Sequence, residues 1–313
     1  MNLLYLAKPR FGGWISFTAH LALKQKWKLF RLTKTVESTE RDFGYGVKYQ
    51  NTNIDNLPKS ILITAIDKNF YKYLDKIPDK SYIVIHDPTE LRKELIPHLK
   101  RFKIITIRKT VQDLLKNKYN LDSLFLLHPF YPYNRGCTAD LKVDTVSISR
   151  IDYDKYTHIL IEANNILKSN EQKTVKIYGK KNDLYVYRKL GDSLDPYYNG
   201  SFRRGFDELN KILNPARFVV DLSAIKDDGS GSQYTFLEAI YSKCVLIINK
   251  AWTDNLESDF INGVNCYTVK DAEELAELLA AKHDLPQMRI NAQKILLPHL
   301  NINWQNFLYI NNI

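Results

Sequence analysis

This 313-residue sequence has little cysteine and no long apolar run, and each shortage argues against a class of protein. Its three cysteines, Cys137, Cys244 and Cys266, lie far apart and form no CxxC pair. This argues against a disulfide framework and against a structural zinc site, so we expect buried thiols. No apolar run approaches the roughly 20 residues that cross a bilayer, and we expect no transmembrane segment.

The first residues also lack the pattern of a secretory signal. The start MNLLYLAKPRFGG has a short apolar run and no small-residue cleavage site, so we expect a first strand there and a cytoplasmic protein. With 44% hydrophobic and 26% charged residues, the composition is that of a globular protein. The length fits two domains of ordinary size.

The excess of positive charge lies in the N-terminal part of the chain. Residues 1–134 contain 23 of the 45 Lys and Arg residues and 12 of the 35 Asp and Glu residues, a balance of +11. Residues 135–313 contain the other 22 and 23, a balance of −1. Such an excess attracts polyanions through phosphate contacts, which makes nucleic acid a candidate partner. The alternative is a lysine-rich surface that serves only solubility.

Short apolar runs alternate with helical patterns along the whole chain, which is typical of an α/β protein with parallel sheets covered on both faces. The expected strands are residues 2–6, 60–66, 81–86, 103–107, 123–128, 143–149, 174–179, 216–223 and 243–249. The expected helices are residues 16–25, 67–77, 89–102, 108–119, 156–169, 206–213, 234–242 and 271–282.

The alternation is interrupted once, at residues 129–142, which contain two prolines and a glycine and have no period. We interpret this segment as a linker. It predicts two doubly wound, Rossmann-like domains, residues 1–134 and 135–298. A ligand is then expected in a cleft, where the carboxyl ends of the strands of both sheets face each other.

The strand at 143–149 is followed by Arg150 and, five positions later, by Lys155. This spacing, together with the order of the segments over residues 143–295, resembles the donor domain of retaining glycosyltransferases of the GT-B fold, family four in particular. The resemblance implies that both cations face the diphosphate of a nucleotide-sugar, where charge develops as the nucleoside diphosphate departs. Two exposed basic residues at a helix start are the structural alternative.

The segment GSGSQYTFLEA predicts a second part of the donor site, because a glycine-rich loop that opens a helix offers N–H groups to phosphate. Ser232, Tyr234 and Thr235 would lie at this helix start. By resemblance, Glu238 is the second glutamate of the family's paired motif and binds the ribose. The first glutamate is missing: Ser230 stands there, and Asp228 replaces it only if the loop carries an insertion. A plain N-capped helix is the alternative.

The resemblance assigns three further residues to the donor site. Tyr178 closes a strand at the cleft, and Phe202 would meet the base, although either aromatic could belong to the core. Gly13, in the loop Lys8–Trp14, would close over the donor phosphates from the first domain. Asp152-Tyr153-Asp154 spells the DxD motif, which binds a divalent metal in another glycosyltransferase fold. Here Arg150 and Lys155 flank the motif and can neutralise a diphosphate themselves, so we expect no metal.

The resemblance also implies that the last helix crosses back to the first domain. Residues 299–313 are therefore assigned to that domain. They contain Trp304, Phe307 and Leu308 at helical spacing, which we expect to be core contacts.

The segment YIVIHDPTELRK resembles phage DNA α-glucosyltransferases, in which a histidine-aspartate pair follows a comparable strand and precedes a basic helix. By that resemblance Asp87 acts on the acceptor hydroxyl or steadies positive charge at the sugar carbon, and His86 positions it or the sugar. The alternative makes Asp87 the N-cap of a helix that begins at Pro88.

Together with these patterns, the resemblance implies a retaining, metal-independent hexosyltransferase. We expect it to be monomeric, to need no cofactor and to use UDP-glucose as its donor. The acceptor is expected to be double-stranded viral DNA with hydroxymethylated bases, reached by base flipping. A glycan or lipid acceptor, and a nucleotide-sugar-binding protein without turnover, are the alternatives. The residues expected to contact DNA phosphates are Lys8, Arg10, Arg92, Lys93, Arg108 and Lys109.

Overall fold

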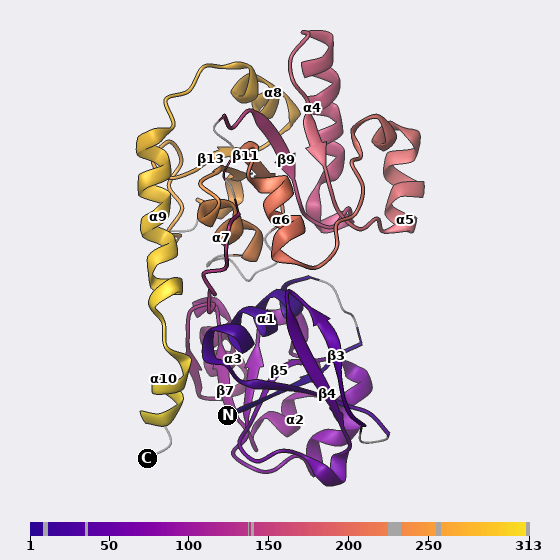
Figure 1. Cartoon of the computed structure of the whole chain (residues 1–313), viewed down its shortest axis with the longest axis vertical. Helices are drawn as coiled ribbons and strands as arrows, with labels where there is room; N and C mark the ends of the chain where they lie inside the picture. The colour runs from indigo at the N-terminus through magenta and orange to yellow at the C-terminus, as the bar shows by residue number, and fades with distance from the viewer. Residues whose placement is uncertain are drawn as a thin grey trace. The chain divides into compact units, whose positions relative to one another are not determined.

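The computed structural model describes residues 1–8, 12–34, 37–136, 138, 141–224, 233–254 and 258–310. The chain forms two compact units, and Figure 1 traces it through both. The first unit consists mainly of Met1–Pro132 and Pro298–Ile313, and the second mainly of Tyr133–Ile225 and Ser232–Leu297. Each unit is a parallel α/β structure, so the expected fold class, two doubly wound Rossmann-like units, is confirmed.

The first unit is built on an eight-stranded sheet in the order β3-β4-β2-β1-β5-β6-β7-β8. All neighbours are parallel except β3 and β4. The strand order reverses between β1 and β5. The strands are β1 (Asn2–Leu6), β2 (Lys28–Leu32), β3 (Glu37–Gly44), β4 (Val47–Thr52), β5 (Ile61–Ile66), β6 (Tyr82–Ile85), β7 (Lys103–Thr106) and β8 (Ser123–Phe125).

Helices cover both faces of this sheet. On one face, α3 (Lys109–Tyr119) buries Val111 and Leu115 in a core with Ile63 and Ile83 of the strands. On the other face, α1 (Gly13–Gln25) joins Thr18 to Thr64 of β5 through a 2.8 Å hydroxyl–hydroxyl hydrogen bond. Alternate residues of each strand thus enter opposite cores, as the period of two in a strand requires.

The C-terminal segment belongs to the first unit, as expected from the return of the last helix to that domain. The segment α9 (Pro286–Asn301) leads to α10 (Trp304–Ile310). Trp304 is fully buried, donates its indole N–H to the Leu127 carbonyl at 3.1 Å, and packs edge to face on Phe17 of α1. Leu308 is also buried, whereas Phe307 is 42% exposed, so its expected core contact is wrong.

Residues 28–52 form three strands that the sequence analysis did not predict. Strand β3 is the edge of the sheet and carries the charged residues Glu40, Arg41 and Asp42, a composition that protects an edge but hides the strand pattern. It turns into β4 through Tyr45 and Gly46, which both have positive φ, 56° and 75°. Two such residues in succession are the geometry of a tight hairpin turn.

The expected helix over residues 89–102 is wrong. The chain there forms a 3₁₀ turn, Pro88–Glu90, and a single helical turn, α2 (Ile96–Leu99). Pro97 explains part of this, because proline is accommodated only in the first turn of a helix. Arg92 and Lys93 therefore lie outside any helix. The expected helix over residues 67–77 is a 3₁₀ helix, Lys68–Lys76.

The second unit is built on a five-stranded parallel sheet in the order β10-β9-β11-β12-β13. Its strands are β9 (Asp144–Ser147), β10 (Val175–Ile177), β11 (Ala216–Asp221), β12 (Val245–Asn249) and β13 (Tyr267–Val269). Its helices, besides most of α9, are α4 (Thr157–Ser169), α5 (Asp183–Tyr185), α6 (Phe206–Leu213), α7 (Tyr234–Tyr241) and α8 (Ala272–Ala280).

Helices α4 and α8 pack together in one core of this unit, through residues such as Leu160 and Leu275.

Cys244 and Cys266 are buried, as expected, and burial raises the pKa of these thiols to about 11 and about 12. They are therefore protonated and weakly nucleophilic at neutral pH. Cys137 lies outside the described residues. Among the helices of the described ranges, none has the length and apolarity needed to cross a membrane.

Candidate functional site

The carboxyl ends of three neighbouring strands meet in the second unit. The chain leaves β9 toward β10 on one side and returns as β11 on the other, so the strand order switches between β9 and β11. Ligands of open α/β sheets bind at such switch points. Arg150 and Lys155 follow β9, Gly179 follows β10, and Ser223 follows β11.

Lys155 connects the two loops that flank the switch point. Its Nζ donates to Ser223 Oγ at 2.5 Å. The Ser223 hydroxyl in turn donates to Asp221 Oδ1, which also accepts the Ser223 N–H at 3.0 Å. Asp221 and Ser223 are both 1% exposed, whereas Lys155 is half-buried. A cation is thus held at the carboxyl edge of the sheet by a buried hydroxyl.

Arg150 lies on the same loop and is paired with both aspartates of the DxD sequence. Its two terminal nitrogens lie 2.8 Å from Asp152 Oδ2 and 3.3 Å from Asp154 Oδ2. Asp152 also caps the 3₁₀ turn Tyr153–Lys155 and accepts a hydrogen bond from Asn182. The two carboxylates therefore orient Arg150, and in the described part of the chain no three His, Cys, Asp or Glu side chains gather as metal ligands.

Gly179 sits against the loop that carries Arg150. A Cβ built on it would lie 1.9 Å from the Ser149 carbonyl oxygen, and its φ is +151°. Its N–H donates to the Gly200 carbonyl and its carbonyl accepts from the Tyr198 hydroxyl, both at 3.0 Å. Only glycine allows this close approach. The neighbouring candidates Tyr178 and Phe202 are both half-buried.

The start of α7 differs in detail from its expected geometry. Tyr234 and Thr235 occupy the first turn, but the Tyr234 side chain is buried, and burial raises the pKa of its phenol. Glu238 is 4% exposed and accepts a hydrogen bond from the hydroxyl of Tyr133, whose ring stacks on Phe206 at 3.8 Å. Ser232, Ser230 and Asp228 lie outside the described residues.

In the first unit, His86 ends up buried behind the carboxyl edge of the sheet. Its Nε2–H donates to the Thr64 carbonyl at 2.8 Å, and its ring packs edge to face on Phe17. Burial lowers the pKa of His86 to about 4, so the imidazole is neutral at physiological pH. This supports a positioning role better than a proton-transfer role.

Asp87 is an N-cap, which is the alternative to the catalytic role that the resemblance implied. Its Oδ1 accepts the Thr89 N–H at 2.8 Å and the Thr89 hydroxyl. It remains half-buried, next to the charge of Arg108. Arg108 is half-buried, and burial lowers the pKa of its guanidinium, whose charge is felt by Asp87 and Glu90.

Glu90 is a polar residue of this cluster that the sequence analysis missed. It is 6% exposed; its Oε1 accepts the Trp14 indole N–H at 2.6 Å and its Oε2 accepts the His86 N–H at 3.0 Å. Burial raises the pKa of Glu90. A sequence signal existed, because a glutamate three residues after a capping aspartate is the spacing of a capping box.

The remaining candidates of the first unit lie at its surface. Gly13, Lys8, Arg92, Lys93 and Lys109 are exposed, and Lys109 pairs with Asp113 at 3.2 Å. Arg10 lies outside the described residues. Surface cations of this kind can contact phosphates but do not by themselves define a site.

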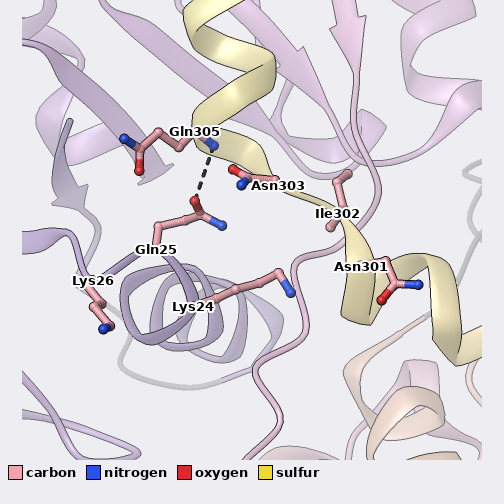
Figure 2. A pocket seen from close by; sticks show the side chains of 7 residues that line it. All are labelled: Lys24, Gln25, Lys26, Asn301, Ile302, Asn303 and Gln305. Atoms are coloured by element: carbon pink, nitrogen blue, oxygen red, sulfur yellow. Dashed lines mark hydrogen bonds between the residues drawn. The ribbon is translucent and has the colours of Figure 1, made fainter.

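A hollow of about 300 Å³ opens at the end of α1 and is lined mainly by carboxamides (Figure 2). Gln25 accepts the Gln305 N–H at 3.3 Å, and Lys24 donates to the Leu300 carbonyl. These bonds fasten the C-terminal segment to α1. The hollow contains none of the candidate catalytic or donor-binding residues. Its lining residues are Lys24, Gln25, Lys26, Asn301, Ile302, Asn303 and Gln305.

The neutral His86 predicts a pH-dependent stability. Because its folded pKa of about 4 lies below the value near 6.5 of an exposed histidine, the unfolded chain takes up a proton first as the pH falls. This residue should therefore lower the free energy of unfolding by about 2–3 kcal/mol between pH 7 and pH 4.5. Glu90, with a raised pKa, acts in the opposite direction, since its stabilisation is lost as the pH rises through its folded pKa.

The comparison of wild type with His86→Gln isolates this effect, since Glu90 is common to both. Urea unfolding at pH 7 and pH 4.5 should show that the stability advantage of the wild type shrinks by about 2–3 kcal/mol at the lower pH. An advantage that is the same at both pH values would contradict a neutral, buried His86.

Neither the known protein-family models nor the curated protein sequences match this chain. Solved structures do match. HepE from Anabaena, solved with UDP and glucose, is 14% identical with a TM-score of 0.69, and the match covers 100% of both chains. An α-glucosyltransferase solved with UDP and a 13-mer DNA containing an HMU base is 12% identical with a TM-score of 0.71, over 99% of this chain and 97% of the other.

A third match is shorter. TarM from S. aureus, solved with UDP, is 15% identical with a TM-score of 0.56 over 76% of this chain, which spans about half, 51%, of the TarM chain. At these identities the likeness concerns the fold. The chain has the fold of GT-B glycosyltransferases, as the sequence resemblance implied.

Proposed function

We propose that this chain is a glycosyltransferase that transfers a hexose from a UDP-sugar, with the diphosphate bound at the switch point of the second unit. The observation that carries the proposal is the cation pair after β9, with Lys155 Nζ held 2.5 Å from Ser223 Oγ beside Arg150. HepE, TarM and the DNA-bound α-glucosyltransferase, which share the fold, were all solved with UDP.

Sugar transfer requires stabilisation of the negative charge on the departing UDP. When the bond from the sugar carbon to the diphosphate oxygen breaks, that oxygen gains negative charge, which a fixed cation stabilises more in the transition state than in the ground state. Arg150 offers a planar fork of donors, and Lys155 a point charge. With two such cations the reaction needs no metal, and we propose retention of the anomeric configuration by resemblance to the family.

In the first unit, we assign Asp87 and His86 to the acceptor side of the reaction. Asp87 is half-buried, and its carboxylate can accept the hydroxyl proton of an acceptor or steady an oxocarbenium-like sugar carbon. His86, neutral and fixed by Thr64, positions Asp87 or the sugar. Glu90 joins this pair to Trp14 of α1.

Two measurements test the activity. Calorimetry with UDP and UDP-glucose should show binding, and radiolabelled UDP-glucose should be hydrolysed slowly in the absence of an acceptor, since a transferase leaks some donor to water. Binding without any turnover would favour a nucleotide-sugar-binding protein. No affinity for any nucleotide or nucleotide-sugar of a broad panel would refute the proposal.

For the acceptor we propose DNA with hydroxymethylated bases. The +11 balance of residues 1–134 and the fold shared with the DNA-bound α-glucosyltransferase support it. Lys8, Arg92, Lys93 and Lys109 are exposed and remain the phosphate contacts of this proposal. A flipped base would present its hydroxymethyl group to Asp87.

The DNA proposal predicts a steep salt dependence. Four phosphate contacts should weaken duplex binding about 100-fold between 50 and 200 mM salt, as measured by fluorescence anisotropy. The double variant Arg92→Ala/Lys93→Ala should flatten that slope by about two contacts, whereas Lys211→Ala, an exposed lysine of the second unit, should not.

A glycan acceptor is the second candidate. HepE, whose structure contains UDP and glucose, matches this chain over its whole length, so the shared fold does not by itself require a DNA acceptor. Negligible duplex binding at every salt concentration, together with donor hydrolysis, would favour this candidate over DNA.

A further inference from the structure

The loop after β11 contains a serine, Ser223, that contacts Lys155 but has so far been given no role of its own. Ser223 is 1% exposed, and all its polar groups are bonded: its N–H and hydroxyl donate to Asp221 Oδ1, and its carbonyl accepts the Trp252 indole N–H at 3.0 Å. The hydroxyl hydrogen therefore points at Asp221, which leaves an oxygen lone pair for Lys155 Nζ at 2.5 Å.

The backbone holds the same two loops together. The Ala224 N–H donates to the Asp154 carbonyl at 2.8 Å, and the Lys155 N–H donates to the Asp152 carbonyl at 3.0 Å. The loop after β9 is thus fixed to the loop after β11 at the residue before Lys155, and the turn within the loop after β9 orders the backbone of Lys155 itself. A long lysine side chain otherwise loses considerable rotamer entropy when it is fixed.

We propose that Ser223 is a positioning residue for the donor, which holds the Lys155 ammonium at the switch point before the diphosphate arrives. This inference rests on the proposed function. In it, the Ser223 hydroxyl alone fixes the position of the Lys155 ammonium before the donor binds. Asp221 serves as the acceptor that orients this hydroxyl. Within the described part of the chain its other oxygen, Oδ2, is buried and accepts no hydrogen bond, so the orientation depends on Oδ1 alone.

The test compares UDP affinity and kinetics of wild type, Ser223→Ala and Ser223→Thr. Loss of the hydroxyl should weaken UDP binding about 5–10-fold, the equivalent of one ordinary hydrogen bond. Ser223→Thr keeps a hydroxyl and should recover at least half of the lost binding free energy. Because a poorly positioned Lys155 also stabilises the departing UDP less well, kcat for UDP-glucose should fall by at least the same factor. The matched control is Ser147→Ala, an equally buried serine on β9, which should bind UDP as the wild type does.

A double variant distinguishes positioning from a general structural role. If Ser223 acts through Lys155, Ser223→Ala should change UDP affinity less than twofold in a Lys155→Ala background. Asp221→Asn keeps an acceptor at Oδ1, so it should bind UDP within about twofold of the wild type. A full additional loss in the double variant, or a loss in Asp221→Asn as large as that in Ser223→Ala, would overturn this inference.

The wild type separates this inference from the function itself. UDP binding by the wild type that Ser223→Ala leaves unchanged would refute only the role of Ser223. A wild type that binds no UDP would refute the proposed function, and this inference with it.

Discussion

Lys155→Ala is expected to lower kcat/KM for UDP-glucose hydrolysis and transfer by about 10²–10³-fold. The reason is that this ammonium lies at the switch point of the second sheet, where the departing UDP would gain charge. Removing one charge-stabilising group from a preorganised site typically lowers the rate by this factor. Steady-state kinetics with radiolabelled UDP-glucose measure the loss.

A matched lysine controls for charge and fold. Lys176 pairs with Asp144 at 2.7 Å at the beginning of β9, away from the carboxyl ends of the strands, so Lys176→Ala should keep kcat/KM within about twofold of the wild type. Lys155→Ala should also bind duplex DNA nearly as the wild type does, because the proposed phosphate contacts lie in the first unit. Equal losses of DNA binding and turnover would show that Lys155 serves another surface.

Gly179→Ala is expected to destabilise the second unit by about 3–5 kcal/mol. Its new Cβ would lie 1.9 Å from the Ser149 carbonyl oxygen at a φ of +151°, so the backbone before Arg150 has to move. Because that loop carries both proposed diphosphate cations, UDP affinity should fall as well. Urea unfolding and UDP calorimetry measure the two effects.

Gly205→Ala is the control for this change. Gly205 has an extended φ of −170°, and a Cβ on it would have no heavy atom within 4 Å. It should therefore cost at most about 1 kcal/mol, chiefly through a poorer N-cap for α6. If Gly179→Ala were as stable as Gly205→Ala, the close packing of β10 against the Arg150 loop would be wrong.

The alternation of apolar runs and helical patterns predicted β1 and β5 to β8 of the first sheet and β9 to β12 of the second, because buried parallel strands are apolar throughout. The same signal fails at residues 28–52, which form β2, β4 and the charged edge strand β3, and at residues 89–102, where Pro97 interrupts an apparent helix. Local patterns therefore predicted the centre of each sheet better than its edge.

The candidate site was predictable where it depends on one strand and the loop that follows it. Arg150, Lys155 and the His86–Asp87 pair all belong to such loops. The contacts of Glu238 with Tyr133 and of Lys155 with Ser223 join residues 105 and 68 positions apart, and no spacing in a single sequence reveals them. For the same reason the partial burial of Arg108 near Asp87 and Glu90 was not foreseen.

A crystal structure of this chain with bound UDP would show where the diphosphate binds. Its oxygens should lie within hydrogen-bond distance of Lys155 Nζ and of the Arg150 guanidinium, at the carboxyl ends of β9 and β11. A UDP molecule bound elsewhere, with both cations pointing away from its phosphates, would refute the proposed donor site.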